Sequence, residues 1–388
     1  MKTYNYMNTK IITLFAALSL WMMACSPKTT QEVETIVFDY SSETPLYQYD
    51  RIESISLTPL QTDDNCLIGN EPVLRFASDN LFILHQRWSP TERIDRFNTQ
   101  GQHLNQIGRR GRGPGEISFA ISDWFFYGDN MIGLRGFFRK NILLFDFAGN
   151  FVREAHVNAP TPAGVRGPVF ITHLHGSDFL AVMPALTDST LLVRVSETGA
   201  EAGPMLKSKK TYPIDMEIFP PFFQTNGRLY YSTIHDNAVY KVAQDTVSLA
   251  FLTYPGKYAI PQDFYNNPNY DAFESLIQNG IVAIYNFLES NDYYIIQLIV
   301  KQLEFEGLIW GIKHKREKEW FWGKMETWEL GAFEYTSAAI TEDNRLLILI
   351  PPYSLEKHLP FMKNVLNPQV ASSIKEDDNP VLVELRLK

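Results

Sequence analysis

The most informative part of the chain reads DNLFILHQRWSPTERIDRFNTQGQHLNQI at residues 79–107, and DNMIGLRGFFRKNILLFDFAGNFVREA at residues 129–155 follows the same plan. In both segments an Asp-Asn pair precedes an apolar run, a polar connection leads to a second run, and a glycine turn leads to a third. Short β-branched and aromatic runs bounded by glycine and polar residues are typical of strands joined by turns. Each segment therefore predicts an antiparallel meander.

The same pattern recurs along the rest of the chain. Its apolar runs contain Leu81, Ile132, Phe179, Leu229, Tyr293 and Leu346, which are spaced by 51, 47, 50, 64 and 53 residues. A four-stranded meander cannot bury both faces alone, whereas radial stacking buries them and leaves only short edges. The spacing predicts an all-β fold, a six-bladed β-propeller of four-stranded antiparallel blades at residues 35–388. The rival folds are a β-sandwich pair, which lacks this period, and a β-solenoid, whose coils are shorter.

Closure of a propeller ring requires the two chain ends to share a blade. Two segments are suited to this, TIVFDY at residues 35–40 and VLVELRL at residues 381–387. The second alternates apolar and polar residues, as a half-buried strand does. We therefore predict that N- and C-terminal strands close the ring. Residues 307–328 fit the blade pattern poorly.

The 64-residue interval contains an insertion at residues 258–279. Proline and asparagine residues at 261–269 break any strand, and residues 272–278 are suited to a short helix. The segment is rich in aromatic residues, including Tyr265 and Tyr270. Long connections on a rigid scaffold often carry function, so these two tyrosines are candidate ligand-binding residues in a lid or binding loop. The alternative is a loop that packs its own aromatic side chains against a blade.

The N-terminus has the pattern of an export signal. Lys2 and Lys10 precede an uncharged stretch, residues 11–24, that is too short to span a membrane comfortably and ends before Cys25. The last residues resemble the lipobox of bacterial lipoproteins, although Met22 stands where leucine is usual. We predict a signal peptide at residues 1–24, a lipid attached at Cys25 and a tether at residues 25–34. The alternative is an ordinary secretory signal followed by an unrelated cysteine.

This interpretation places the protein in the cell envelope, anchored by lipid to the outer membrane. The tether lacks the early acidic run of surface-exported lipoproteins, which favours the periplasmic side over the cell surface. The formal net charge of −9 argues against nucleic acid as a partner, because phosphate binding needs clustered lysine and arginine. Cys66 is the only other cysteine, so no disulfide forms within the mature chain. We expect Cys66 to be buried as an apolar residue rather than to act as a reactive thiol.

A loop rich in glycine and arginine, GRRGRGPGE at residues 108–116, lies between the first two repeats. Its arginines can grip a carboxylate or a phosphate, which makes Arg109, Arg110, Arg112 and Glu116 candidate ligand-binding residues. The alternative is a connector between blades whose arginines pair with nearby acids. The loop lacks the Lys-Ser/Thr pair of a P-loop, and no βαβ unit surrounds it as in a dinucleotide fold.

These features resemble the six-bladed β-propeller lipoproteins of Bacteroidota, which are distantly similar to propellers with NHL repeats and to TolB-like propellers. The resemblance rests on the loop at 108–116, the Asp-Asn pairs that begin repeats and the ending NPVLV at residues 379–383. It covers most of residues 33–388. It implies the propeller fold and an exported, lipid-anchored protein, and it implies no particular activity.

Residues for catalysis do not form a known motif in this sequence. His173 and His175 would share one face of a strand, as in some metal sites, but no third ligand is identifiable, so we predict no metal, no cofactor and no catalytic residue. Four tryptophans lie among basic residues at 310–328, where they can stack on sugar rings or pack a core. Neither G-x-S-x-G nor H-E-x-x-H occurs.

The sequence therefore favours a binding module held at a membrane by its lipid, with a glycan, a peptide or an envelope protein as its ligand. The alternative is a carbohydrate-active enzyme of the envelope or a lactonase, with its site at the mouth of the propeller tunnel.

Overall fold

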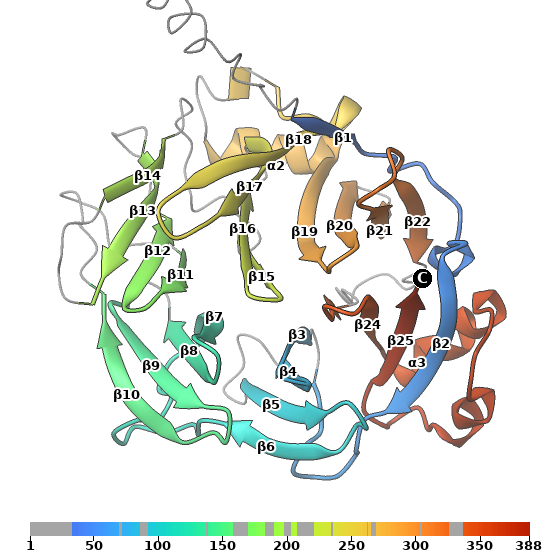
Figure 1. Cartoon of the computed structure of the whole chain (residues 1–388), viewed down its shortest axis with the longest axis horizontal. Helices are drawn as coiled ribbons and strands as arrows, with labels where there is room; N and C mark the ends of the chain where they lie inside the picture. Colours follow the sequence, from blue (N-terminus) through green and yellow to red (C-terminus); the bar gives the residue numbers. More distant parts are fainter. Residues whose placement is uncertain are drawn as a thin grey trace, which may run out of the picture. The chain divides into compact units, whose positions relative to one another are not determined.

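The strands form six antiparallel sheets arranged as the blades of a ring (Figure 1). The computed structural model describes residues 33–69, 72–85, 92–136, 139–157, 170–182, 190–197, 203–207, 221–233, 236–261, 263–264, 269–302, 305–325 and 337–388. Residues Thr35–Lys388 make up one compact unit. The predicted six-bladed β-propeller is confirmed.

The blades follow one another along the chain, and the first strand of each lies nearest the centre of the ring (Figure 1). Blade 1 contains β3 (Val73–Ala77), β4 (Asn80–His85), β5 (Arg93–Asn98) and β6 (His103–Ile107). Blade 2 contains β7 (Ile121–Tyr127), β8 (Met131–Gly136), β9 (Asn141–Asp146) and β10 (Phe151–His156). Blade 3 contains β11 (Phe170–His175), β12 (Asp178–Val182), β13 (Thr190–Ser196) and β14 (Gly203–Lys207).

In the second half of the ring, blades 4 and 6 depart from this scheme because each takes its outermost strand from the N-terminal segment. Blade 4 has β15 (Phe222–Thr225), β16 (Arg228–Thr233), β17 (Asp236–Val242), β18 (Val247–Tyr254) and, as a fifth strand, β1 (Glu34–Val37). Blade 5 has β19 (Ile281–Glu289), β20 (Tyr293–Gln302), β21 (Phe305–His314) and β22 (Phe321–Met325). Blade 6 has β23 (Ala338–Ile340), β24 (Arg345–Ile350), β25 (Val381–Leu387) and β2 (Ile52–Pro59).

The hydrophobic core lies between the blades rather than within them. Phe82 and Ile94 of blade 1, for example, share one buried cluster with Ile132 and Leu143 of blade 2. Burying apolar side chains against the next sheet is what holds the ring together, at roughly 25 cal/mol per Å² of apolar surface removed from water.

The six equivalent residues of the sequence repeat all lie on the second strand of their blades, from Leu81 on β4 to Leu346 on β24. The repeat was therefore identified correctly, but each blade begins one strand earlier than the Asp-Asn pairs suggest. Residues 307–328, which fit the blade pattern poorly in the sequence, contribute the third and fourth strands of blade 5.

The ring is closed by β2, which pairs with the C-terminal strand β25 along its whole length. The prediction that residues 35–40 provide the closing strand is wrong. That segment instead forms β1 at the outer edge of blade 4, where Ile36 and Phe38 are buried in the cluster between blades 4 and 5. The apolar side chains of Ile36 and Phe38 fill part of that cluster. The longer strand β2 pairs with β25 instead.

We call residues 34–59 the N-terminal strap, because they run along the outer edges of three successive blades. After β1, the backbone N–H of Lys324 on β22 donates to the carbonyl of Thr44, 2.7 Å away. The strap continues through a short 3-10 helix, η1 (Leu46–Gln48), to β2 in blade 6. It therefore covers sheet edges that would otherwise present unpaired backbone groups.

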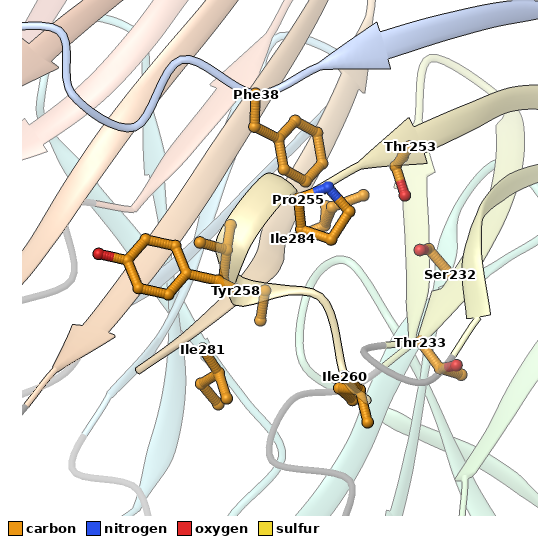
Figure 2. A pocket seen from close by; sticks show the side chains of 11 residues that line it. Phe38, Ser232, Thr233, Thr253, Pro255, Tyr258, Ile260, Ile281 and Ile284 are labelled. Atoms are coloured by element: carbon orange, nitrogen blue, oxygen red, sulfur yellow. The ribbon is translucent and has the colours of Figure 1, made fainter. Parts of the chain in front are cut away.

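Two insertions interrupt the blade pattern. The first, between β18 and β19, contains the 3-10 helix η3 (Gly256–Tyr258) and the helix α2 (Tyr270–Asn279), whose Ala272 and Leu276 pack near the core between blades 3 and 4. The small pocket beneath η3 has a volume of about 20 Å³, enough for one water molecule (Figure 2). This part of the insertion is packed rather than open to a ligand.

The second insertion, between β24 and β25, was not predicted. It contains α3 (Pro352–His358), η5 (Leu359–Phe361) and η6 (Pro368–Ser373). Ile55 on β2 exchanges backbone hydrogen bonds with residues 364 and 366, and the side-chain amide of Asn367 bonds both backbone groups of Leu57. The insertion thus covers the outer edge of blade 6. None of the helices in the described ranges has the length and apolarity needed to cross a membrane.

Candidate functional site

A cavity of about 810 Å³ opens where the turns between the first and second strands of five blades converge. Consecutive strands are antiparallel, so this turn lies on the same face of the ring in every blade, close to the axis. The lining residues come from blades 1, 2, 3, 4 and 6, at 76–79, 126, 128–129, 147, 173–176, 224–229, 341–343 and 345. The volume is within the range of small-molecule and peptide side-chain sites.

The turn of blade 1 is strained. Ser78 and Asp79 both have positive φ angles, 49° and 55°, although neither is glycine. The equivalent turn of blade 4 uses Asn226 and Gly227 for the same backbone conformation, which is the favoured pair for a two-residue hairpin. Residues held in the left-handed region cost about 1–3 kcal/mol each and gather at functional sites. Ser78 and Asp79 therefore hold a costly backbone conformation at the rim of the cavity.

Aromatic side chains form part of the cavity wall. Phe76, Phe126 and Phe147 line it and are each half-buried. Phe126 and Phe147 lie 6.0 Å apart, and both contact the fully buried Phe82. Half-exposed aromatic rings on a rigid support offer apolar area for a ligand at little entropic cost.

The rim of the cavity is acidic. Asp79, Asp129, Glu342 and Asp343 contribute four carboxylates, and in the described ranges Asp79, Asp129 and Glu342 form no ion pair. Arg345 is engaged by Asp343 at 3.0 Å and by Glu384 at 3.4 Å. Burial raises the pKa of Asp343, but hydrogen bonds from Thr341 and Arg345 outweigh it and leave the pKa below its usual value. After the pairing of Arg345 is counted, the rim therefore carries a negative charge.

The other arginine of the cavity, Arg228, is held by a buried carboxylate. Its Nε lies 3.4 Å from Glu289, which also accepts a hydrogen bond from the Tyr230 hydroxyl and one of 2.6 Å from Lys315. Burial alone would raise the pKa of Glu289, but its hydrogen bonds to Lys315 and Tyr230 lower it overall. This network joins blades 4 and 5, and Glu289 offsets part of the positive charge of Arg228 and Lys315.

Gln224 connects three blades across the axis at the cavity. Its side-chain oxygen accepts hydrogen bonds from Arg75 of blade 1, at 3.1 Å, and from the backbone N–H of Phe126 of blade 2, at 2.9 Å. The guanidinium of Arg75 also lies 4.4 Å from the ring centre of Trp124. The hydrogen bonds of Gln224 therefore link blades 1, 2 and 4 at the cavity and fix the position of the strands that line it.

The two histidines singled out in the sequence line the cavity but form no metal site. The Nδ1 of His173 accepts from the backbone N–H of Gly128, and its Nε2 lies 3.1 Å from the carbonyl of Gly176, which assigns a neutral ring. Burial lowers the pKa of His173. His175 lies 3.7 Å from Asp178. Among the residues that the structure describes, no group of three or more histidine, cysteine or acidic side chains is placed to hold a metal.

The glycine-arginine loop lies outside the cavity, in the connection from β6 to β7 on the opposite face of the ring. Arg110 donates to the backbone carbonyl of Glu92 at 2.8 Å, to its carboxylate at 3.0 Å and to the carbonyl of Phe119. Glu92 is fully buried. This arginine therefore clamps the connection between blades 1 and 2.

The rest of the loop is folded around its own carboxylate. Glu116 accepts a hydrogen bond of 2.8 Å from the backbone N–H of Gly113 and pairs with the exposed Arg109 at 2.9 Å, and these bonds lower its pKa. A Cβ at Gly111 would lie 1.9 Å from this carboxylate, so a larger residue there would displace the Glu116 side chain. Arg112 is exposed. A role for these four residues in ligand binding stays a prediction, separate from the cavity.

The remaining sequence candidates lie partly outside the described residues. Cys25 and Tyr265 are among the undescribed residues, and Tyr270 begins α2, with a side chain that is not described. Trp320 and Trp322 stack on each other at 5.9 Å and contact Phe251 and Phe38, so they pack under the N-terminal strap. Trp310 is fully buried and Trp328 is not described.

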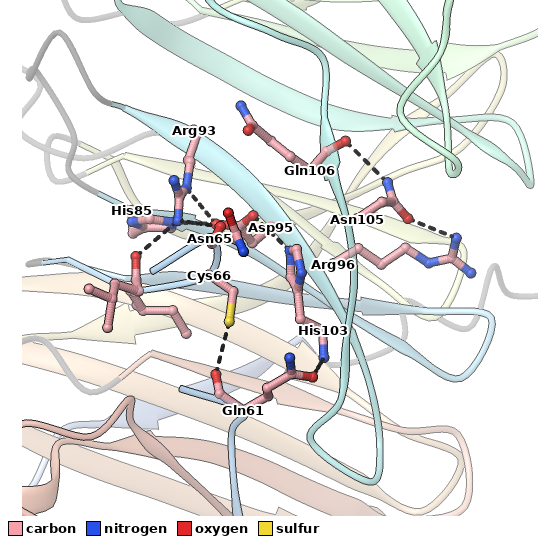
Figure 3. A network of polar contacts seen from close by, with 12 residues as sticks. Gln61, Asn65, Cys66, His85, Arg93, Asp95, Arg96, His103, Asn105 and Gln106 are labelled. Atoms are coloured by element: carbon pink, nitrogen blue, oxygen red, sulfur yellow. Dashed lines mark hydrogen bonds and ion pairs between the residues drawn. The ribbon is translucent and has the colours of Figure 1, made fainter. Parts of the chain in front are cut away.

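A buried polar network between blades 1 and 6 is the other dense group of titratable side chains (Figure 3). Asp95 is fully buried and contacts His85 at 2.7 Å, Arg93 at 2.7 Å and His103 at 3.1 Å. The Nδ1 of His85 accepts from the backbone N–H of Gly69, so its Nε2 is the nitrogen that donates to Asp95. Arg93 and Asn379 bind backbone carbonyls of residues 61–67, so the network fixes the connection between these blades.

Cys66 lies in that connection and is fully buried, as expected. Its thiol donates to the carbonyl of Gln61 at 3.2 Å, and burial raises its pKa. A buried thiol with a raised pKa is a poor nucleophile, so the network has the character of structural support.

Sequence reasoning did not identify the cavity rim, although the sequence contains a pattern that marks it. The Asp-Asn pairs at 79–80, 129–130 and 343–344 served only to align the repeat. When a polar turn recurs at the same position of successive blades, closing the blades into a ring brings these turns together near the axis. The recurrence could therefore have identified the rim.

Comparison with known proteins identifies a family model and two solved structures of the same fold. A family model described as a domain of unknown function (DUF4934) matches residues 33–386. The structure is similar to that of a protein from Bacteroides fragilis described as exported, with a TM-score of 0.69, 18% identity, and coverage of 91% of this chain and 99% of that chain. A DUF4221 member from Bacteroides vulgatus has a TM-score of 0.53, 10% identity, and coverage of 87% and 97%. No curated protein matches the chain. At these identities the two structures show the fold alone.

Proposed function

The chain belongs to the DUF4934 family, and we propose that it is an exported, lipid-anchored binding module of the cell envelope whose ligand occupies the cavity at the convergent turns. The observation that carries the proposal is the cavity itself, with its strained turn, aromatic wall and acidic rim. Enclosed volume with apolar walls and a few convergent polar groups is the usual form of a ligand site.

Export and anchoring are supported by the N-terminus. A basic start, the uncharged residues 11–24 and Ala24 before Cys25 have the order of a lipoprotein signal. The Bacteroides fragilis protein of the same fold is described as exported. Several acyl chains on Cys25 would hold the protein at a membrane stably, because each buried CH₂ contributes roughly 0.8 kcal/mol.

The chemistry of the cavity favours a peptide segment with a basic side chain. Asp79, Asp129 and Glu342 offer negative charge without ion pairs in the described chain, while both cavity arginines are held by carboxylates. Phe76, Phe126 and Phe147 offer apolar contact beside these acids. A lysine or arginine next to an aromatic or aliphatic side chain would match both features.

Calorimetric titration of residues 26–388 with the peptide Ac-Lys-Tyr-Lys-amide tests this proposal. We expect binding to weaken on the order of tenfold in Asp79→Asn and in Asp129→Asn, because each removes one charge from the rim. Asp64→Asn is the matched control, since Asp64 is exposed in the connection before blade 1 and does not line the cavity. Binding that is absent, or that is equally weakened by all three substitutions, would contradict the proposal.

The four cavity carboxylates also favour a second candidate, a glycoside hydrolase of the envelope. Hydrolysis of a glycosidic bond needs two carboxyl groups about 5–10 Å apart, one of them as a general acid. Release of reducing sugar from a glycan by the wild-type protein, abolished in Asp79→Asn or Asp129→Asn and retained in Asp64→Asn, would establish this function in place of simple binding.

A further inference from the structure

The outer strands of blade 4 carry apolar side chains that are open to solvent. Val37 on β1 is 59% exposed, and Leu252 and Tyr254 on β18 are 41% and 57% exposed. Ile36 and Phe251 alternate with them along the strands and are buried in the core between blades 4 and 5. Strand alternation therefore places Val37, Leu252 and Tyr254 together on the outward face, which we call the blade 4 face.

This face lies where the N-terminal segment joins the propeller. β1 starts at Glu34, and the backbone N–H of Phe38 donates to the carbonyl of Tyr254. Only eight residues lie between Cys25 and Glu34. A fully extended chain of that length reaches about 30 Å, so a lipid on Cys25 would keep the blade 4 face within that distance of a bilayer.

Two further side chains near the face are suited to the membrane interface. Tyr254 combines an apolar ring with a polar hydroxyl, the type of residue that gathers at headgroup level. Lys257 is exposed, and its ammonium lies 5.9 Å from the ring centre of Tyr40, which packs against the adjacent core. An exposed lysine beside apolar groups is attracted to anionic lipid headgroups.

We propose that the blade 4 face rests on the lipid bilayer, so that the anchored propeller stands on its edge. This inference depends on the lipid anchor of the proposed function. Because the outer strands form the circumference of the ring, the ring axis would then run parallel to the membrane. The cavity would open sideways along the membrane surface, within reach of envelope peptides on that side.

Depth-dependent fluorescence quenching tests this orientation. The full lipidated protein, with Leu252→Cys or Tyr254→Cys carrying an environment-sensitive fluorophore, is reconstituted into vesicles of phosphatidylethanolamine and phosphatidylglycerol that contain nitroxide lipids. Leu104→Cys on β6 and Val152→Cys on β10 are the matched controls, because both positions are exposed and apolar but belong to blades 1 and 2. Cys66 is buried and stays unlabelled.

We expect quenching at positions 252 and 254 to exceed that at 104 and 152 several-fold. Equal or absent quenching at 252 and 254 in protein that floats with the vesicles would overturn the orientation alone. A full chain that does not float, or that floats equally well as Cys25→Ser, would overturn the lipid anchor and the orientation with it. Disulfide cross-linking between two copies through Leu252→Cys would show that a second chain covers this face, which also contradicts the proposal.

Discussion

Arg109 and Arg110 are adjacent in the chain but have different roles. Arg109 projects into solvent with 82% of its side chain exposed, whereas Arg110 reaches the fully buried Glu92 and two backbone carbonyls. The sequence offered both arginines as ligand-binding candidates, because residue type alone does not distinguish a free guanidinium from one that satisfies a buried acid. The difference depends on Glu92, which lies eighteen residues away in sequence.

Arg110→Ala is expected to lower the free energy of unfolding by about 3 kcal/mol, because it removes a guanidinium that pairs with the buried Glu92 carboxylate. Arg109→Ala and Arg112→Ala are expected to leave it nearly unchanged, since both side chains are exposed. Urea unfolding of the three variants measures this. Equal losses in all three, or no loss in Arg110→Ala, would show that Arg110 is not a structural clamp.

Among the structural elements, the insertion in blade 6 adds a titrating group to the fold. α3 places His358 in a buried position, 4% exposed, with its ring 5.9 Å from that of Tyr47 in the N-terminal strap. Burial, assisted by the charge of Lys357, lowers the pKa of His358 to about 4. Protonation of this ring therefore opposes the contact between the insertion and the strap.

The folded protein is expected to lose stability as the pH falls from about 6.5 to about 4. The unfolded chain takes up the His358 proton near pH 6.5 and the folded chain only near pH 4, so the stability is fully present above pH 6.5 and is lost below it, by up to about 3 kcal/mol. Urea unfolding at a series of pH values measures how steeply the free energy of unfolding changes with pH. The substitution His358→Gln should make this dependence weaker between pH 4 and pH 6.5. An unchanged dependence would contradict the assignment of the effect to His358.

The N-terminal strap and the blade 6 insertion are the elements that the sequence did not reveal. Both act at sheet edges, where pairing depends on which distant segment packs there in the folded ring. β1 has the alternating pattern of any edge strand, and nothing in residues 34–37 specifies β18 as its neighbour. The pairing follows from the fit of Ile36 and Phe38 into the core between blades 4 and 5, which exists only in the folded ring.

At the scale of the whole molecule, the architecture could be predicted because a propeller repeats one local pattern. Leu81, Ile132 and their four equivalents each lie on the second strand of a blade. Each apolar run alone is weak evidence for a strand, but six of them at similar spacing are strong evidence for a propeller. The recurring polar turns could have located the rim in the same way, but not its chemistry, because that lies in the differences among residues from five blades. Asp79 of blade 1 and Phe147 of blade 2 line one cavity only after the ring closes.

Photo-cross-linking tests most directly whether the ligand occupies the cavity at the convergent turns. The peptide Ac-Lys-Tyr-Lys-amide, with a photoreactive group on its tyrosine, is bound to residues 26–388, irradiated and mapped by mass spectrometry. We expect cross-links to the cavity residues, at 76–79, 126, 128–129, 341–343 and 345. Cross-links confined to the loop at 108–116 or to the insertion at 258–279 would contradict it and place the ligand on the opposite face of the ring.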